Sequence, residues 1–219
     1  MREHNEITIR VKDAVKVYGE QTVLNHVSLE LRKGVIYGFV GQNGSGKTVL
    51  FKSICGFTKL TKGTVEVLGK KIGTDVDMAE NVGAIIETPG FLTNFNAVRN
   101  LKFLASLKNT IDDDKIIETI RLVGLDPDSR KKVGKFSMGM RQRLGIAQAI
   151  MEDPEILILD EPFNGMDKKG TEEIRQLLLD MKKLGKTILL ASHSSEDIEI
   201  LCDEVYEMEM GVCTKKLIL

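Results

Sequence analysis

A short glycine-rich segment constrains the fold of this sequence more than any other feature. It lies between an apolar run at 35–40 and a segment with helical periodicity at 47–55. Glycines let such a loop curl until successive backbone N–H groups face one concavity, where the following helix adds positive partial charge. A strand–loop–helix context of this kind is the one in which the pattern binds polyphosphate. The residues expected to contact a nucleotide are Gly41, Gln42, Asn43, Gly44, Ser45, Gly46, Lys47 and Thr48.

A pair of carboxylates follows a second apolar run and completes the expected chemistry. Asp160 and Glu161 come directly after residues 156–159, and ligand sites in parallel sheets lie at the carboxyl ends of strands. We expect Lys47 to reach the terminal phosphates, and Thr48 and Asp160 to hold Mg²⁺. Glu161 would then polarise the attacking water as a general base.

The spacing of apolar residues predicts an α/β fold. Continuous apolar runs at 35–40, 156–159 and 187–191 suit buried parallel strands, and helical stripes such as 171–184 follow them. Alternating apolar residues near the N-terminus predict two antiparallel, half-exposed strands, and two further strands are expected at about 204–208 and 212–217. Periodicity between about 88 and 151 is helical. We expect one domain over residues 1–219, with this helical subdomain inserted in the α/β core.

Charge and composition give no sign that this chain binds nucleic acid or is itself secreted. Lys and Arg number 31 against 32 Asp and Glu, a net charge of −1, so no general attraction to nucleic acid or to an anionic membrane is expected. The polar start has no secretory signal. Apolar runs are far shorter than the ~20 residues of a membrane helix. Three widely spaced cysteines fit neither a disulfide framework nor a metal knuckle. We expect a cytoplasmic chain whose membrane contact comes through a partner.

A third motif gives the sequence a resemblance to a known family. Residues 136–143 begin a strong helical pattern, with Ser137 placed as its N-cap, which makes a second helix start suited to phosphate. Together with the two motifs above, its order and spacing resemble the ABC ATPases, whose signature reads Leu-Ser-Gly-Gly-Gln. Ser137 and Gly139 match that signature, whereas Met138 and Met140 replace its first Gly and its Gln.

The resemblance assigns roles to residues outside the three motifs. Tyr18 would stack on adenine, although a tyrosine at a strand end is more commonly an interfacial residue. His193 would sense the γ-phosphate, and Asp167 would communicate across a dimer, a role compatible with that of a helix N-cap. Two copies would sandwich two ATP molecules, so that each phosphate loop faces Ser137 and Gly139 of the other copy.

Glu87 stands where the family usually carries Gln. With the following Thr-Pro-Gly-Phe and the altered signature, it resembles the bacitracin-resistance and lantibiotic-immunity group of bacterial ABC transporters. A carboxylate at this place could bind Mg²⁺ or orient water, but it adds negative charge beside Asp160, Glu161 and ATP. We therefore expect Glu87, Glu161 and His193 to form the catalytic set.

The resemblance implies an ATPase subunit that uses ATP and Mg²⁺ to power separate transmembrane permease subunits, which expel an antimicrobial peptide. This subunit would lie at the inner face of the cell membrane. One alternative is a soluble ABC ATPase of translation or DNA repair, although a second such domain and a long coiled coil are both missing. Another is a P-loop kinase for a small molecule, against which residues 137–143 and His193 argue.

Overall fold

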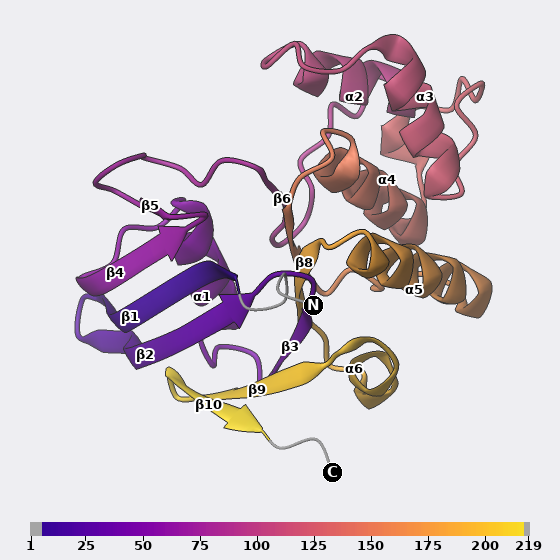
Figure 1. Cartoon of the computed structure of the whole chain (residues 1–219). Coiled ribbons are helices and arrows are strands. Elements are labelled where there is room, and N and C mark those ends of the chain that lie inside the picture. Colours follow the sequence, from indigo (N-terminus) through magenta and orange to yellow (C-terminus); the bar gives the residue numbers. More distant parts are fainter. Residues whose placement is uncertain (1–5, 217–219) are drawn as a thin grey trace.

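Two β-sheets carry the fold in the computed structural model, which describes residues 6 to 216 (Figure 1). One sheet is antiparallel, with the order β2-β1-β4-β5, and the other has the order β10-β9-β3-β8-β7-β6. The antiparallel strands are β1 (Ile7–Tyr18), β2 (Gln21–Arg32), β4 (Lys62–Val67) and β5 (Lys70–Lys71). The parallel strands are β3 (Ile36–Val40), β6 (Val82–Ile85), β7 (Ile156–Asp160), β8 (Thr187–Ala191) and β9 (Glu204–Glu209), and β10 (Val212–Lys216) pairs antiparallel to β9.

Helices cover both faces of the second sheet. In Figure 1 the antiparallel sheet and α1 lie on one side, and α4 and α5 lie on the other. No helix of residues 6–216 combines the length and apolar character needed to cross a membrane. The helices are α1 (Lys47–Cys55), α2 (Ala97–Ala105), α3 (Asp113–Leu122), α4 (Met138–Ile150), α5 (Lys168–Lys183) and α6 (Ser195–Leu201), with a 3₁₀ turn at Val133–Lys135.

The α/β fold expected from the sequence is confirmed, as are the strands at 35–40, 156–159 and 187–191 and the two N-terminal strands. Residues 88–151 contain α2, α3 and α4 and no strand. The helix expected at 171–184 begins earlier, at Lys168, because the Asp167 side chain accepts a hydrogen bond from the Gly170 backbone and starts it there. Residue 217, expected in the last strand, lies outside the described residues.

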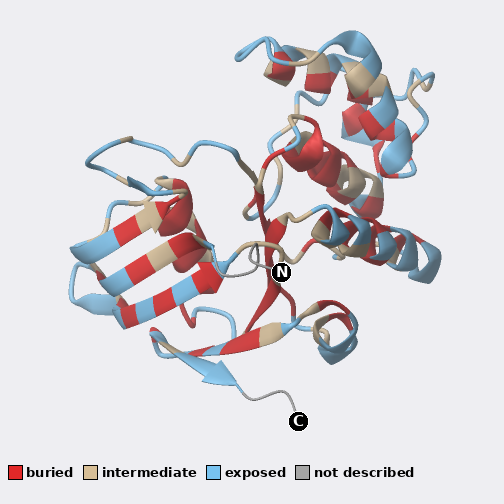
Figure 2. Cartoon of the chain, viewed as in Figure 1, coloured by how far each residue is buried: buried red, intermediate tan, exposed pale blue. Residues whose placement is uncertain are grey.

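The core divides into two apolar clusters on opposite faces of the parallel sheet. Along β7, Leu157 and Leu159 belong to the cluster with α4 and α5, whereas Ile156 and Ile158 belong to the cluster with α1 and the antiparallel sheet. Successive side chains of a strand point to opposite faces, so both faces of β7 are buried, as the red central strands of Figure 2 show. This burial explains why the strand reads as an unbroken apolar run.

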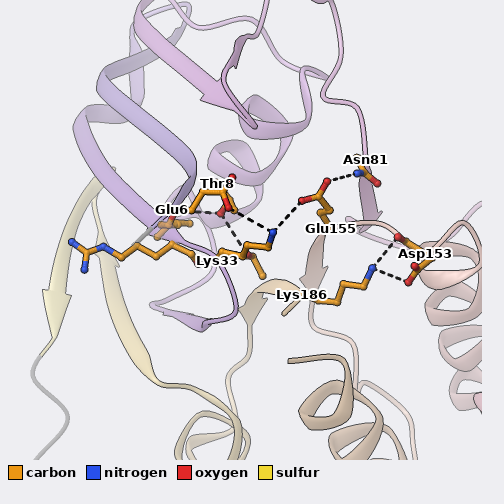
Figure 3. A network of polar contacts seen from close by, with 10 residues as sticks. Glu6, Thr8, Lys33, Asn81, Asp153, Glu155 and Lys186 are labelled. Atoms are coloured by element: carbon orange, nitrogen blue, oxygen red, sulfur yellow. Dashed lines mark hydrogen bonds and ion pairs between the residues drawn. The ribbon is translucent and has the colours of Figure 1, made fainter. Parts of the chain in front are cut away.

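Polar contacts tie the two sheets together at the edge where β7 and β8 begin (Figure 3). The Thr8 hydroxyl, on β1, lies 3.2 Å from the Leu31 carbonyl oxygen and 3.4 Å from the Thr187 hydroxyl on β8. Nearby, Lys33 pairs with Glu6 and with Glu155. Because β3, β7 and β8 end at the opposite edge, this network leaves that edge free for a site.

Helix α4 approaches β6 closely at Gly83, and this contact is sensitive to one added carbon. A Cβ atom at Gly83 would lie 1.8 Å from the Ala149 carbonyl oxygen, which belongs to helix backbone and cannot simply rotate away. We predict that Gly83→Ala lowers the free energy of unfolding by about 1–3 kcal/mol, the usual cost of overpacking. Circular dichroism should show this as a melting temperature lower by about 2–4 °C per kcal/mol.

Gly90→Ala is the matched control for this change. Nothing lies within 4 Å of a Cβ built at Gly90, so its melting temperature should match that of the unaltered chain. Equal melting temperatures for the two variants would show that the Gly83 contact does not limit packing.

Candidate nucleotide-binding site

The phosphate loop joins the carboxyl end of β3 to the first turn of α1 and is pressed against neighbouring backbone. A Cβ atom at Gly41 would lie 2.2 Å from the Met208 carbonyl oxygen, and one at Gly46 would lie 2.6 Å from the Val23 carbonyl oxygen. Both glycines also have positive φ angles, 145° and 110°, which other residues rarely adopt. Two of the loop's glycines are thus required by their positive φ angles and by the lack of space for a side chain, so the loop can pack directly against these two backbones.

Lys47 lies buried at the base of the loop. Its ammonium group donates hydrogen bonds to the Gly41 carbonyl oxygen at 2.6 Å and to the Gln42 carbonyl oxygen at 3.1 Å. Burial lowers the pKa of this ammonium, and the negative charges of Asp160 and Glu161 oppose that shift. A cation held at the base of the loop is well placed to attract the terminal phosphates of a nucleotide.

The two residues expected to hold Mg²⁺ meet across the sheet edge. Thr48, in the first turn of α1, donates a hydrogen bond of 2.7 Å to Asp160, the last residue of β7. Within residues 6–216, no group of three or more His, Cys, Asp or Glu side chains is arranged to hold a metal ion by itself. One hydroxyl and one carboxylate fit Mg²⁺, which commonly takes few protein ligands and completes its shell with phosphate oxygens and water.

Glu161 turns its side chain into the cleft beside Asp160. Its backbone has a positive φ of 51°, and its Oε1 atom is buried and accepts no hydrogen bond among the described residues, although His193 Nε2 lies within ion-pair distance at 3.3 Å. Burial raises the pKa of the Glu161 carboxyl, the Asp160 charge adds to the rise, and His193 and Lys47 oppose it. An acceptor oxygen with raised proton affinity suits a general base.

His193 bridges the phosphate loop and Glu161. Its Nε2 atom lies 2.9 Å from the Asn43 side-chain oxygen and 3.3 Å from Glu161 Oε1. His193 follows β8, Asn43 follows β3 and Glu161 follows β7, so three neighbouring parallel strands deliver these side chains to one edge. They line a cleft of about 320 Å³ that also includes Thr48, Asp160 and Glu87.

Glu87 lines the cleft from the segment after β6, and its carboxylate forms an ion pair with a lysine of α1. Its carboxylate lies 2.7 Å from the ammonium of Lys52, which lies on α1. The backbone of Glu87 has a positive φ of 63°. The expected accumulation of negative charge beside Asp160 and Glu161 is therefore partly offset by Lys52.

Gln142 belongs to the cleft, although sequence reasoning gave it no role. It lies on α4, is buried, and donates a hydrogen bond of 3.0 Å to the backbone carbonyl of Glu161. The one usable signal in the sequence is a polar residue within the helical pattern, because such a side chain needs a hydrogen-bond partner if it is buried. Its partner lies 19 residues further along the chain.

Six predicted residues lie outside the lining of the cleft: Gly41 and Gln42, which begin the phosphate loop, and four residues from other segments. Tyr18 ends β1 half exposed, at 49%, with the Lys16 ammonium 4.6 Å from the ring centroid. Ser137 and Asp167 act as N-caps, accepting hydrogen bonds from the Met140 and Gly170 backbones. Gly139 is buried, and a Cβ atom there would lie 2.6 Å from the Gly165 carbonyl oxygen. Contacts of these four residues with a nucleotide stay a prediction.

Comparisons with known proteins agree with this geometry. The sequence profile described as "ABC transporter" matches residues 24–164. The chain is 43% identical to the uncharacterized ABC transporter ATP-binding protein YybJ of Bacillus subtilis (strain 168), over 93% of each chain. It is 41% identical to the bacitracin transport ATP-binding protein BcrA of Enterococcus faecalis, over 94% of this chain and 68% of that protein. With the lantibiotic transport ATP-binding protein SrtF of Streptococcus pyogenes it shares 34% identity, over 89% of this chain and 84% of that one.

Solved structures show the same fold. The ATP-binding subunit of an ABC transporter superposes with a TM-score of 0.86 at 25% identity, over 96% of this chain and 90% of that one. A dimeric ATP-binding cassette bound to ADP and phosphate, MJ0796, superposes with a TM-score of 0.85 at 21% identity, over 96% and 100%.

The Lys52–Glu87 pair allows the role of the Glu87 carboxylate to be separated from that of the ion pair. We predict that Glu87→Gln retains nucleotide binding and changes ATP turnover several-fold, because the amide keeps an oxygen but loses the charge. Lys52→Met removes the same ion pair and leaves the carboxylate in place. Both variants should unfold within about 1 kcal/mol of the unaltered chain, since exposed ion pairs contribute little.

Steady-state ATPase assays and titration with a fluorescent ATP analogue make the comparison. A change in turnover confined to Glu87→Gln assigns the effect to the carboxylate, and an equal change in both variants assigns it to the ion pair. Turnover equal to that of the unaltered chain in Glu87→Gln would contradict any role for Glu87 in hydrolysis.

Proposed function

The chain belongs to the ABC transporter family of ATP-binding subunits, which are ATPases, and on that premise we propose that two copies hydrolyse MgATP at their interface to drive separate membrane subunits. One observation carries the proposal: the phosphate loop, Asp160 and a buried Glu161 carboxylate oxygen meet at one sheet edge.

Each group of residues in the cleft has a separate role in hydrolysis. Backbone N–H groups of the loop and the α1 N-terminus hold the phosphates, and Lys47 neutralises their charge. Thr48 and Asp160 would hold Mg²⁺, which would add to the neutralisation of the phosphate charge. Glu161 accepts a proton from the attacking water, and His193, in contact with Glu161 and Asn43, holds the γ-phosphate end of the cleft.

A second copy of the chain would complete the site. Ser137 starts α4 at an exposed position and is absent from the lining of its own chain's cleft, so it is available to the phosphates of a partner copy. Gly139 would follow it there, Asp167 would lie at the same interface, and Tyr18 would cover the adenine. Dimeric cassettes among the structural neighbours support this arrangement.

The relatives supply the proposed substrate class. BcrA is described as a bacitracin transport protein and SrtF as a lantibiotic transport protein, and both are similar to this chain over most of its length. We therefore propose export or expulsion of an antimicrobial peptide through permease subunits at the inner face of the membrane. Residues 1–219 would form a single domain, with the helical subdomain at about 88–151 contacting those subunits.

Glu161→Gln tests the composite site. The amide keeps the size of the side chain but cannot accept the proton, so ATP turnover should fall about 100-fold or more while nucleotide binding persists. We predict that size-exclusion chromatography with ATP and Mg²⁺ shows a dimer of this variant, and a monomer without nucleotide. The double variant Lys47→Ala, Glu161→Gln is the control and should stay monomeric, because the phosphates lose their buried cation. If Glu161→Gln stays a monomer with ATP and Mg²⁺, the proposed dimer with ATP at its interface is wrong.

Substrate class is tested in cells. We predict that cells expressing this chain together with its permease tolerate more bacitracin or lantibiotic than cells in which Lys47→Ala replaces the unaltered chain. Growth against a panel of peptide antibiotics measures the difference. Equal tolerance across the panel, with the complex shown by co-purification to be assembled, would exclude this substrate class.

A further inference from the structure

The loop that carries His193 is held from behind by a buried polar cluster, formed by Arg175, Asp197 and Ser192. Arg175 lies on α5, Asp197 on α6, and Ser192 directly after β8. Their exposed fractions are 8%, 3% and 4%. The cluster lies outside the residues that line the nucleotide cleft.

Both oxygens of the Asp197 carboxylate are used, each by a different element. Arg175 donates to Oδ1 through Nε at 2.9 Å and also through Nη2. Ser192 donates its hydroxyl to Oδ2 at 3.0 Å. The same hydroxyl oxygen accepts the backbone N–H of Ser194 at 3.1 Å. The backbone is therefore fixed on both sides of His193, and α5 is connected to that loop through one carboxylate.

The cluster leads directly to the reacting end of the cleft. Ser192 precedes His193, whose ring contacts Asn43 of the phosphate loop and Glu161. Helix α5, which supplies Arg175, begins at its N-cap Asp167, the residue expected at the dimer interface. A movement of α5 would therefore be passed through Asp197 and Ser192 to the His193 loop.

Stability alone is a weak reason for such a cluster. Burying a charge is costly unless it is paired and hydrogen-bonded, and well-packed apolar residues often replace a buried ion pair without loss of stability. What an ion pair with shared hydrogen bonds adds is a defined position for the groups that it joins. Catalysis is sensitive to position, since a displacement of 1 Å can lower a rate about 100-fold.

We propose that Arg175, Asp197 and Ser192 are positioning residues that hold His193 against Asn43 and Glu161 and so set the rate of ATP hydrolysis. They lie outside the lining of the nucleotide cleft and act only through the loop. The inference rests on the proposed function, because it needs hydrolysis in this cleft.

Ser192→Ala is the sharpest test, since it removes one hydroxyl and leaves the Arg175–Asp197 pair in place. We expect kcat for ATP to fall about 10-fold, with KM and the affinity for a fluorescent ATP analogue within about twofold, because the phosphate loop is untouched. The melting temperature should fall by a few degrees, because Asp197 Oδ2 and the Ser194 N–H lose a buried partner, so kcat is measured at a temperature where the variant is fully folded. Ser192→Thr, which keeps the hydroxyl, should recover most of kcat. A purely structural role would lower activity only in step with the loss of folded protein and would not separate kcat from KM.

Asp197→Asn is the second variant and changes the acceptor that Arg175 and Ser192 share. Its single amide oxygen cannot serve both the guanidinium and the Ser192 hydroxyl, so kcat should fall in the same direction. Glu196→Gln is the matched control. Glu196 also pairs with Arg175 but is 70% exposed and does not contact Ser192, so kcat should match that of the unaltered chain.

The outcomes separate the inference from the proposed function. If the unaltered chain hydrolyses no ATP, the proposed function fails. If it hydrolyses ATP and both Ser192→Ala and Asp197→Asn keep its kcat, the positioning role is overturned. A rise in KM without a change in kcat, or a drop in activity that only follows a loss of folded protein, would also overturn it.

Discussion

Burial of β3, β7 and β8 on both faces is the constraint on which the rest of the molecule depends. Their side chains alternate between two apolar clusters, so a shift of one residue in register would move every side chain of a strand into the wrong cluster. Because the strands are parallel, their carboxyl ends meet at one edge. The phosphate loop, the Asp160–Glu161 pair and His193 each follow one of these strands, and their meeting is a consequence of the sheet.

The same burial sets the electrostatics of the cleft. It lowers the pKa of Lys47 and raises that of Glu161, and in both cases it works against the charged form. Thr48 and Asp160 are already hydrogen-bonded to each other, and Lys47 is bonded to loop carbonyls. The chain therefore holds its ligand-binding groups in place with its own contacts, so little rearrangement is needed before a polyphosphate can bind.

One departure from the family signature is matched by a glycine in a distant segment of the chain. Met138 stands where a glycine is expected, and its side chain lies against Gly165, where a Cβ atom would come within 2.6 Å of Met138 Cγ. The bulk of Met138 is thus accommodated by a glycine in the segment before α5. Neither residue explains the other in the sequence, because 27 positions, from 138 to 165, separate them.

Sequence alone determined the features that depend on neighbouring residues. The strand–loop–helix at Gly41 to Thr48, the N-caps at Ser137 and Asp167 and the buried strands were all readable, because caps, turns and strand periods act over a few positions. The short strand β6 was not readable, since four residues containing a glycine carry too little pattern. Only the tertiary structure paired Lys52 with Glu87, Gln142 with the Glu161 backbone, and Arg175 with Asp197. A charged or polar residue has the same letter whether it is solvated or buried, and its partner is decided by how distant elements pack.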